Sequence, residues 1–284
     1  MIKIFIITYL TIFQLVLLSQ PERFFQPENR VKFGNYLFKS KDYLRAIDEY
    51  RNYLKFKPND TLFFKIGIGY ERLENYDFAQ MYFSSYPEKN IFSSEAKLEL
   101  FKIIFLTGNF DELRVKYSTV KKNFKYFPQI TRLNYITYFF EELPLPDSTN
   151  YRLWFAGSAQ DQIMKYYSLK LNLPRKSLTT AGVLSALIPG LGKIYTGNIG
   201  DGITALIVNG LLGFLSYDNF KAGHNFRGWL FAGLTAFFYG GNIYGSVAAA
   251  QIFNKQVKTD YEKDILKFLE RENYFLPEYE FLTE

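Results

Sequence analysis

The hydrophobic pattern divides the chain into a longer mixed region and a shorter apolar region. Three stretches without a charged residue follow one another after residue 174, at 178–191, 202–217 and 229–253. Tyr261, Ile265, Phe268 and Leu269 then recur at helical spacing among charged residues. The pattern predicts an all-α chain with a membrane domain over 174–254 and an amphipathic, acidic tail helix over 255–284.

The first residues have the pattern of a secretory signal. Lys3 precedes a mostly apolar run from Ile4 to Leu18, and Ser19 is a small residue at which cleavage would leave Gln20 first. The alternative is an uncleaved anchor over the same residues, 1–19. Either interpretation predicts that the region after it leaves the cytoplasm.

An internal repeat with a period of 33 residues follows the signal. Small and aromatic residues recur in the same order in both units, as Gly34 and Gly67, Leu37 and Tyr70, Tyr43 and Tyr76, Ala46 and Ala79, and Tyr50 and Phe83. This pattern resembles the tetratricopeptide repeat, and it predicts a short helical solenoid over 28–171. The resemblance implies that the small residues let paired helices approach, that Tyr50 and Phe83 fill the gap between units, and that Pro58 ends a helix. A weaker third unit has Phe101 where a small residue is expected.

Tetratricopeptide-type solenoids hold a segment of a protein partner on their concave side. The resemblance places six residues of this chain there: Asn35, Phe38, Lys39, Ile68, Glu71 and Arg72. The alternative is a solenoid that packs only against its own terminal helices.

The apolar region predicts a transmembrane helical hairpin. The third stretch, Trp229–Phe253, is long enough to cross a bilayer, the second is slightly short, and the first is broken by Pro189. Gly241 and Gly245 predict close helix contact, and Asn209 and Asn242 are expected to pair across the hairpin. The alternative is the buried core of a soluble domain.

The turn between the first two stretches has the order Pro-Gly-x-Gly-x-x-Tyr-x-Gly. It resembles the signature of a bacterial two-transmembrane-helix domain family, with Lys193 where Gln is common. That resemblance assigns ten residues to the membrane-domain motif: Pro189, Gly190, Gly192, Tyr195, Gly197, Gly202, Asn209, Gly241, Asn242 and Gly245. The family brings no established chemistry, although some fused members point toward membrane protein insertion.

Composition excludes several chemistries. The chain has no Cys and one His, so neither a disulfide nor a multi-histidine metal site is available to it. The net charge is +6, and the basic excess surrounds the apolar region, where it suits anionic lipid rather than nucleic acid. We therefore expect no metal, no cofactor, no nucleic-acid partner and no small-molecule substrate.

The sequence thus predicts a non-enzymatic scaffold or adaptor of the bacterial cell envelope. Its partners are the lipid membrane and a protein bound by the repeats, and the repeat domain lies on the extracytoplasmic side of a bacterial membrane. The alternative is a small pore, carrier or membrane enzyme that uses the polar residues of the hairpin.

Overall fold

The structure is a computed structural model that describes residues 26–279, so the expected signal at 1–19 lies outside the described residues. The described part of the chain is helical and contains no strand, which confirms the all-α prediction. It divides into a repeat unit, residues 1–163 with 269–284, and a hairpin unit, residues 164–268. The two divisions fall inside α10 (Ser158–Leu171) and α14 (Asn225–Arg271).

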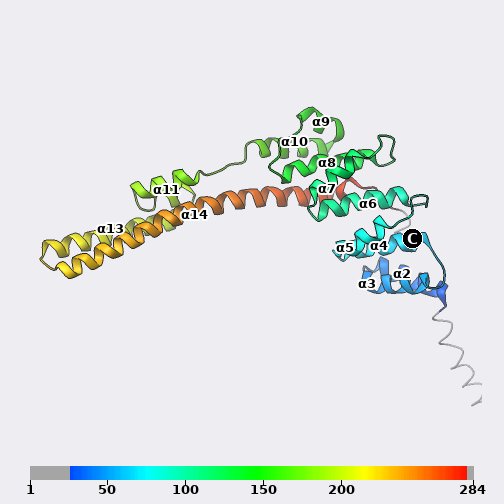
Figure 1. Cartoon of the computed structure of the whole chain (residues 1–284), viewed down its shortest axis with the longest axis horizontal. Coiled ribbons are helices and arrows are strands. Elements are labelled where there is room, and N and C mark those ends of the chain that lie inside the picture. The colour runs from blue at the N-terminus through cyan, green and yellow to red at the C-terminus, as the bar shows by residue number, and fades with distance from the viewer. Residues whose placement is uncertain (1–25, 280–284) are drawn as a thin grey trace, which may run out of the picture. The chain divides into compact units, whose positions relative to one another are not determined.

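The repeat unit is a succession of short helices that pack on their neighbours in chain order (Figure 1). They are α2 (Pro27–Lys39), α3 (Tyr43–Leu54), α4 (Asp60–Arg72), α5 (Tyr76–Ser84), α6 (Ser93–Leu106), α7 (Phe110–Ser118), α8 (Phe127–Phe140) and α9 (Ser148–Trp154). The short 3₁₀ helix η1 (Asn273–Phe275) follows α14 and contacts α8.

The turns inside the first three helix pairs share one backbone conformation. A residue with positive φ precedes the N-cap each time, as Lys41 (62°), Glu74 (56°) and Gly108 (71°). The next residue in the first two turns caps the second helix, because Asp42 accepts from the backbone N–H of Arg45 and Asn75 from that of Phe78. The turn geometry therefore repeats with nearly the period found in the sequence.

The repeated spacing of glycine and aromatic residues fixes how each of the first two pairs closes. A Cβ added to Gly34 would lie 2.7 Å from Cε1 of Tyr50, and one added to Gly67 would lie 2.7 Å from Cε1 of Phe83. The aromatic ring therefore fills the space inside its own pair, against the glycine of the first helix. The expectation that Tyr50 and Phe83 mainly fill gaps between units missed this contact.

Polar links join the first helix of one pair to the next element about 30 residues later. Lys65 Nζ donates to Asn35 Oδ1 at 3.1 Å, joining α4 to α2. Lys102 Nζ then donates to Glu71 Oε1 at 2.6 Å, joining α6 to α4. Lys125, just before α8, donates to Glu95 of α6 at 2.7 Å. These links fix the register in which the first helices stack.

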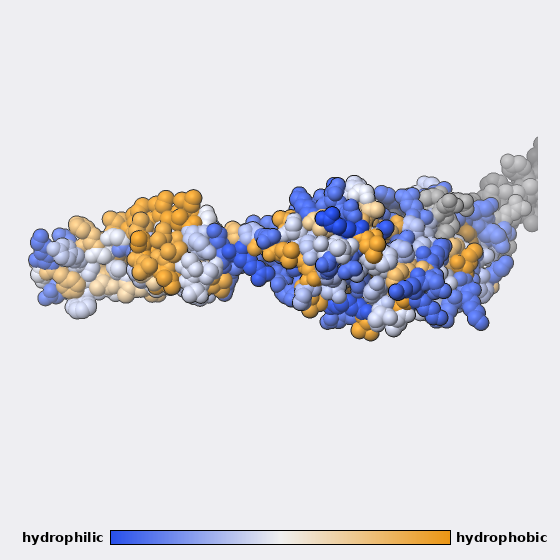
Figure 2. Space-filling model, turned by 90° about the horizontal axis from the view of Figure 1, so that it is seen from above, coloured by the Kyte–Doolittle hydropathy of each residue, from blue (hydrophilic) through white to orange (hydrophobic). Residues whose placement is uncertain are grey.

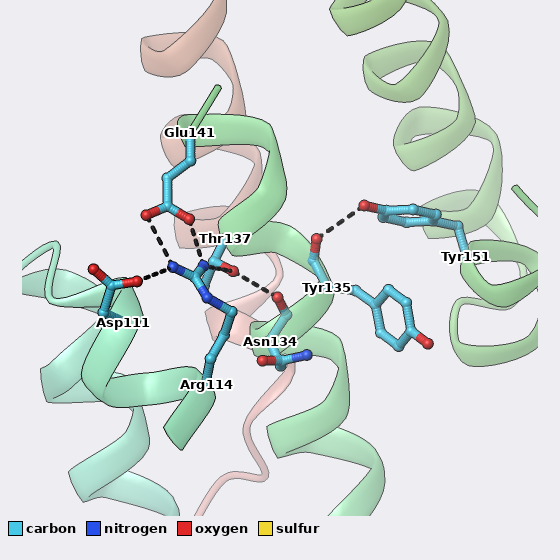
Figure 3. Close-up of polar contacts among 7 residues, drawn as sticks. All are labelled: Asp111, Arg114, Asn134, Tyr135, Thr137, Glu141 and Tyr151. Atoms are coloured by element: carbon cyan, nitrogen blue, oxygen red, sulfur yellow. Dashed lines mark hydrogen bonds and ion pairs between the residues drawn. The ribbon is translucent and has the colours of Figure 1, made fainter. Parts of the chain in front are cut away.

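A guanidinium ties α7 to the end of α8 (Figure 3). Arg114 donates to Asp111 at 2.6 Å and to both carboxylate oxygens of Glu141, at 3.1 Å for Oε1. Thr137 lies in the same cluster, at 3.3 Å from Arg114 Nη1. Because Glu141 follows the last residue of α8, where a negative charge opposes the helix dipole, the guanidinium offsets an unfavourable interaction.

The hairpin unit consists of α11 (Leu178–Leu187), α12 (Leu191–Tyr195), α13 (Ile199–Lys221) and most of α14, with the end of α10. α13 and α14 run alongside each other and are joined by a short turn at 222–224 (Figure 1). Tyr261 and Tyr166 fasten the end of α10 to α14 by reciprocal bonds, each hydroxyl donating to a backbone carbonyl of the other helix at 3.0–3.1 Å.

Among the described helices, α13 is long and apolar enough to cross a membrane. Few residues of its apolar window are buried, and large side chains such as Leu211 and Phe214 are more than half exposed. Figure 2 shows the resulting hydrophobic surface on one face of the hairpin unit. The stretch 229–253, expected to be the spanning one, lies within α14, and it does not meet the same criteria of apolarity.

The helix boundaries after residue 225 also differ from expectation. α14 continues without interruption from Asn225 to Arg271, so no helix end occurs at the predicted boundary of 254/255. Neither Gly nor Pro occurs between residues 246 and 276, and the helix therefore has no local reason to stop. Residues 276–279 follow η1 without regular secondary structure, and Leu276 has an extended backbone.

Candidate functional site

Three charged side chains are buried together on the face formed by α4 and α6. Lys102 Nζ lies 2.6 Å from Glu71 Oε1 and 3.9 Å from Glu99 Oε2, and all three side chains are at most 5% exposed. Burying charges costs free energy unless they are paired. With two carboxyl groups around one ammonium, this ionic cluster carries an excess of negative charge when both are ionised.

The chain's own tail segment, residues 273–279, lies on this cluster. Tyr279 is nearly buried, its hydroxyl donates to Glu99 Oε1 at 2.7 Å, and its ring meets Phe64 edge-on at 5.5 Å. The ammonium of Lys102 lies 5.3 Å from the ring centre of Tyr274, within range of a cation–π interaction. The tail segment therefore supplies aromatic and hydrogen-bonding groups to a polar site that α4 and α6 build.

The tail segment enters the site through an unusual backbone. Asn273, Tyr274 and Phe275 have φ of 45°, 53° and 60°, in the left-handed region that residues with a Cβ rarely adopt. Such conformations cost about 1–3 kcal/mol each and persist only where surrounding contacts hold them. Phe275 supplies such contacts, since its ring lies 5.4 Å from that of Phe155 and 5.7 Å from the guanidinium of Arg132.

Beside the tail segment the groove remains partly open. A cavity of about 420 Å³ is bounded by α4, α6 and the tail segment, and we call this cavity with the surfaces around it the tail groove. It is lined by Ile68, Glu71, Arg72, Glu99, Lys102, Asn273, Pro277, Glu278 and Tyr279. Burial, with a further contribution from the nearby Glu71 carboxylate, raises the pKa of Glu99 to about 8. The Glu99 carboxyl is therefore largely protonated at neutral pH, which lessens the charge imbalance of the cluster.

The six predicted partner-binding residues have different environments. Ile68, Glu71 and Arg72 line the tail groove. Phe38 belongs to the hydrophobic core, and Asn35 accepts hydrogen bonds from Tyr50 and Lys65. Lys39 is exposed, and it does not line this cavity.

The sequence analysis missed Glu99, Lys102 and Tyr279. The repeat alignment could have pointed to Lys102. Phe101 of the third unit aligns with Gly67 of the second, so Lys102 takes the place of Ile68. Tyr279 had no such signal, since its bond to Glu99 joins residues 180 positions apart.

The membrane-domain motif forms a compact turn in which glycine is required. A Cβ on Gly192 would lie 2.0 Å from the carbonyl oxygen of Ala181, and one on Gly190 would lie 1.9 Å from that of Gly202. Gly190 also has a φ of 90°. α11, α12 and the start of α13 therefore approach backbone to backbone at the turn that Pro189 and Gly190 open.

Two hydroxyl groups connect this turn to the rest of the hairpin unit. Ser185 and Ser246 are fully buried and share a hydrogen bond of 2.6 Å, while Ser185 Oγ also accepts from the N–H of Gly192 at 3.0 Å. The hydroxyl of Tyr195 accepts from the backbone N–H of Ser177 at 3.1 Å. Lys176 lies above the Tyr195 ring at 4.5 Å.

The remaining motif residues correct two expectations. Asn209 and Asn242 do not pair: Asn209 Nδ2 donates to the carbonyl of Ala205 at 2.8 Å, and neither amide atom of Asn242 has a hydrogen-bond partner among the described residues. Gly241 faces open space, and Gly245 meets only the Lys193 side chain, at 3.4 Å. Gly197 has a φ of 93° and no close neighbour. The close contact expected along the helices occurs instead at the turn.

The described residues contain no group of three or more acidic, His or Cys side chains suited to a metal ion. The sequence matches no known protein-family model, and no curated protein is significantly similar to it.

Proposed function

We propose that this protein is a membrane-anchored helical-repeat scaffold of the bacterial cell envelope, and that its tail groove binds an extended segment of a protein partner. The observation that carries the proposal is the tail segment itself. Residues 276–279 leave η1 without regular secondary structure, beginning with Leu276 in the extended region, and Tyr279 contacts Phe64 of α4 and Glu99 of α6. A surface that accepts such a segment from its own chain has the chemistry to accept a similar one from another.

The repeat resemblance and the hairpin support the two halves of this proposal. The 33-residue period, the repeated turns and the glycine–aromatic pairs are typical of tetratricopeptide-type solenoids. The exposed apolar side chains of α13 suit a lipid environment, whereas a core helix of a soluble protein would be mostly buried. Hydrophobic surface of this extent on a freely soluble protein would promote aggregation.

A partner segment has to replace the tail segment. The tail is covalently tethered, so it competes at an effective concentration of about millimolar, and only a well-matched partner would displace it. The strained φ values at 273–275 lower the cost of releasing it. The partner segment that fits is extended and aromatic, with a hydroxyl or amide donor that reaches Glu99.

The test measures binding of a fluorescent peptide with the sequence of residues 272–279 to the full chain in detergent. We expect weak binding to the natural protein and at least about tenfold tighter binding to Tyr279→Ala, whose tail no longer competes well. Lys102→Met should abolish binding in both backgrounds, and Val115→Ala, on the exposed face of α7, is the matched control. Equal binding to Tyr279→Ala and the natural protein would contradict the proposal.

The membrane assignment is tested separately by alkaline carbonate extraction of native membranes. A protein anchored by α13 stays in the pellet, and a soluble or peripheral one is released. A photo-crosslinker at Arg72, compared with one at Val115, then asks whether a protein occupies the groove in those membranes. We expect crosslinks to a defined protein from Arg72, more of them in Tyr279→Ala, and none from Val115.

A further inference from the structure

A second cavity lies within the hairpin unit, between facing sides of α13 and α14. Its volume is about 390 Å³. It is lined by Lys193 of α12, by Asp201, Thr204, Ala205, Val208 and Asn209 of α13, and by Phe237, Phe238, Gly241 and Asn242 of α14. The α13 residues recur at spacings of three and four, so they form one face of that helix. We call this cavity the hairpin pocket.

The deep end of the hairpin pocket contains buried amides with unused hydrogen-bonding capacity. Asn242 is 5% exposed and Asn209 is 6% exposed. Both amide atoms of Asn242, and Oδ1 of Asn209, lack a hydrogen-bond partner among the described residues. A buried polar group without a partner costs about 1–3 kcal/mol, so two such side chains in one cavity indicate that a ligand completes them.

The outer end of the same pocket carries one charge of each sign. Lys193 and Asp201 are the only charged residues among those that line it. Asp201 is in the first turn of α13, and Asn209 lies two helical turns, about 12 Å, farther along. Val208, Phe237 and Phe238 add apolar walls to the same pocket. The ligand must therefore present two opposite charges at one end and apolar groups beside them.

We propose that the hairpin pocket binds a phospholipid whose zwitterionic headgroup ends in a primary ammonium, that is, a phosphatidylethanolamine. The phosphate lies near Lys193 and the ammonium near Asp201, where its N–H groups donate to the carboxylate. The Nδ2 group of Asn242 donates to an ester carbonyl, and the acyl chains leave along Phe237 and Phe238.

Other common headgroups match less of this chemistry. A choline headgroup has no N–H to donate, because its nitrogen is fully methylated. A glycerol headgroup has hydroxyl donors but no positive charge for Asp201. The position also fits, since the charged end lies beside Asp201, where the uncharged run of α13 begins, and this is the depth at which headgroups lie in a bilayer.

The test is native mass spectrometry of the full chain in detergent, titrated with phospholipids that share their acyl chains and differ in headgroup. We expect the ethanolamine lipid to bind once per chain, at least about fivefold tighter than the choline or glycerol lipid. Asn242→Leu and Lys193→Met should each weaken it about tenfold, the loss expected for one hydrogen bond or charge contact. Asn219→Leu and Lys221→Met, at the other end of α13, are the matched controls.

Folding and self-association are checked in the same samples. Asn242→Leu removes an unpartnered amide, so it should leave the thermal unfolding followed at Trp229 unchanged or shifted upward without lipid. Equal binding of all three lipids, or full binding by Asn242→Leu, would overturn the proposal. So would a dimer that forms without lipid and depends on Asn242, since a second copy would then occupy the pocket.

The proposal shares only the membrane location with the proposed function. Carbonate extraction tests that location first, and peptide binding in the tail groove is independent of the headgroup titration. A failure to observe the headgroup preference would therefore not contradict peptide binding in the tail groove, and the reverse also holds.

Discussion

The repeat unit and the hairpin unit bury different kinds of polar group. All five buried charged residues of the described chain lie in α4 and α6 of the repeat unit: Lys65, Glu71, Glu95, Glu99 and Lys102. Each has a hydrogen-bond or ion-pair partner. The buried polar residues of the hairpin unit are uncharged, and two of them, Asn209 and Asn242, retain unpartnered atoms.

The two units also differ in how many large apolar side chains they expose. The hairpin unit exposes many large apolar side chains along α13 and α14, as Figure 2 shows for one face. The repeat unit buries most of its apolar residues in a core, and large apolar side chains such as Phe56 and Ile91 are exposed there among charged residues. The comparison teaches that the two units of one chain have surfaces suited to different surroundings. The surface of the repeat unit is suited to water, and that of the hairpin unit is suited to lipid. In the first, every buried charged residue is paired within the protein, although single atoms such as Asn134 Oδ1 have no hydrogen-bond partner. In the second, where both amide atoms of Asn242 lack a partner, we infer that a ligand completes them.

The largest expected effect concerns the turn of the hairpin unit. Gly192→Ala places a Cβ 2.0 Å from a backbone oxygen, which only a backbone shift can relieve. We expect the hairpin unit to lose at least about 4 kcal/mol of stability, in the range reserved for severe steric or buried-charge defects. Thermal unfolding in detergent, followed at Trp229, measures it. Gly241→Ala is the matched control, because open space surrounds Gly241, and a comparable loss there would contradict the assignment of the turn as the close contact.

A second pair of substitutions tests the difference between the units directly. Lys102→Met leaves the buried Glu71 and Glu99 without their ammonium and should cost about 3 kcal/mol or more, as expected when one partner of a buried ion pair is removed. Asn242→Leu removes an unpartnered amide and should be neutral or stabilising. Trp154 reports on the repeat unit and Trp229 on the hairpin unit, so single-tryptophan variants separate the two. If both substitutions lowered the stability of their units, the difference between the two units would be contradicted.

The parts that the sequence predicted are those in which local spacing determines structure. The glycines at 34 and 67 marked where the two helices of each pair approach closely, because that approach depends on residues within one unit. The aromatic residues at 50 and 83 were expected between units, and their rings lie instead against these glycines. The all-α class was likewise accessible from the pattern of apolar residues.

The parts that the sequence could not predict depend on distant contacts. Tyr279 meets Glu99 across 180 positions, and no periodicity announces such a pairing. Asn209 and Asn242 were expected to pair, and they do not, because whether they meet depends on the separation of two helices that only the tertiary structure gives. The continuity of α14 past residue 254 could have been predicted from the sequence, since no Gly or Pro occurs between residues 246 and 276.

A third prediction concerns pH and the ionic cluster. The pKa of Glu99 is raised in the folded state, from an ordinary value near 4.5 to about 8. The unfolded chain therefore loses its Glu99 proton at lower pH than the folded one, and the stability of the repeat unit falls as pH rises from about 5 to 8. We expect a decrease on the order of 3 kcal/mol in the free energy of unfolding followed at Trp154. Glu99→Gln should remove this slope, and a slope that persists would assign it to another group.

The smallest expected effect concerns two arginines at the surface of the repeat unit. Arg114 is 19% exposed and joins α7 to the end of α8 through Glu141, whereas Arg45 is 68% exposed and pairs with Asp42 of its own N-cap. Arg114→Met should cost about 1–2 kcal/mol, because the partly buried Glu141 then faces the α8 dipole without compensation. Arg45→Met should change the unfolding midpoint little, since solvent screens an exposed pair. Denaturant unfolding of both variants at two salt concentrations measures these changes. The loss of unfolding free energy in Arg114→Met should persist in high salt. If it vanished in high salt, the contact between α7 and α8 would be maintained by apolar packing alone.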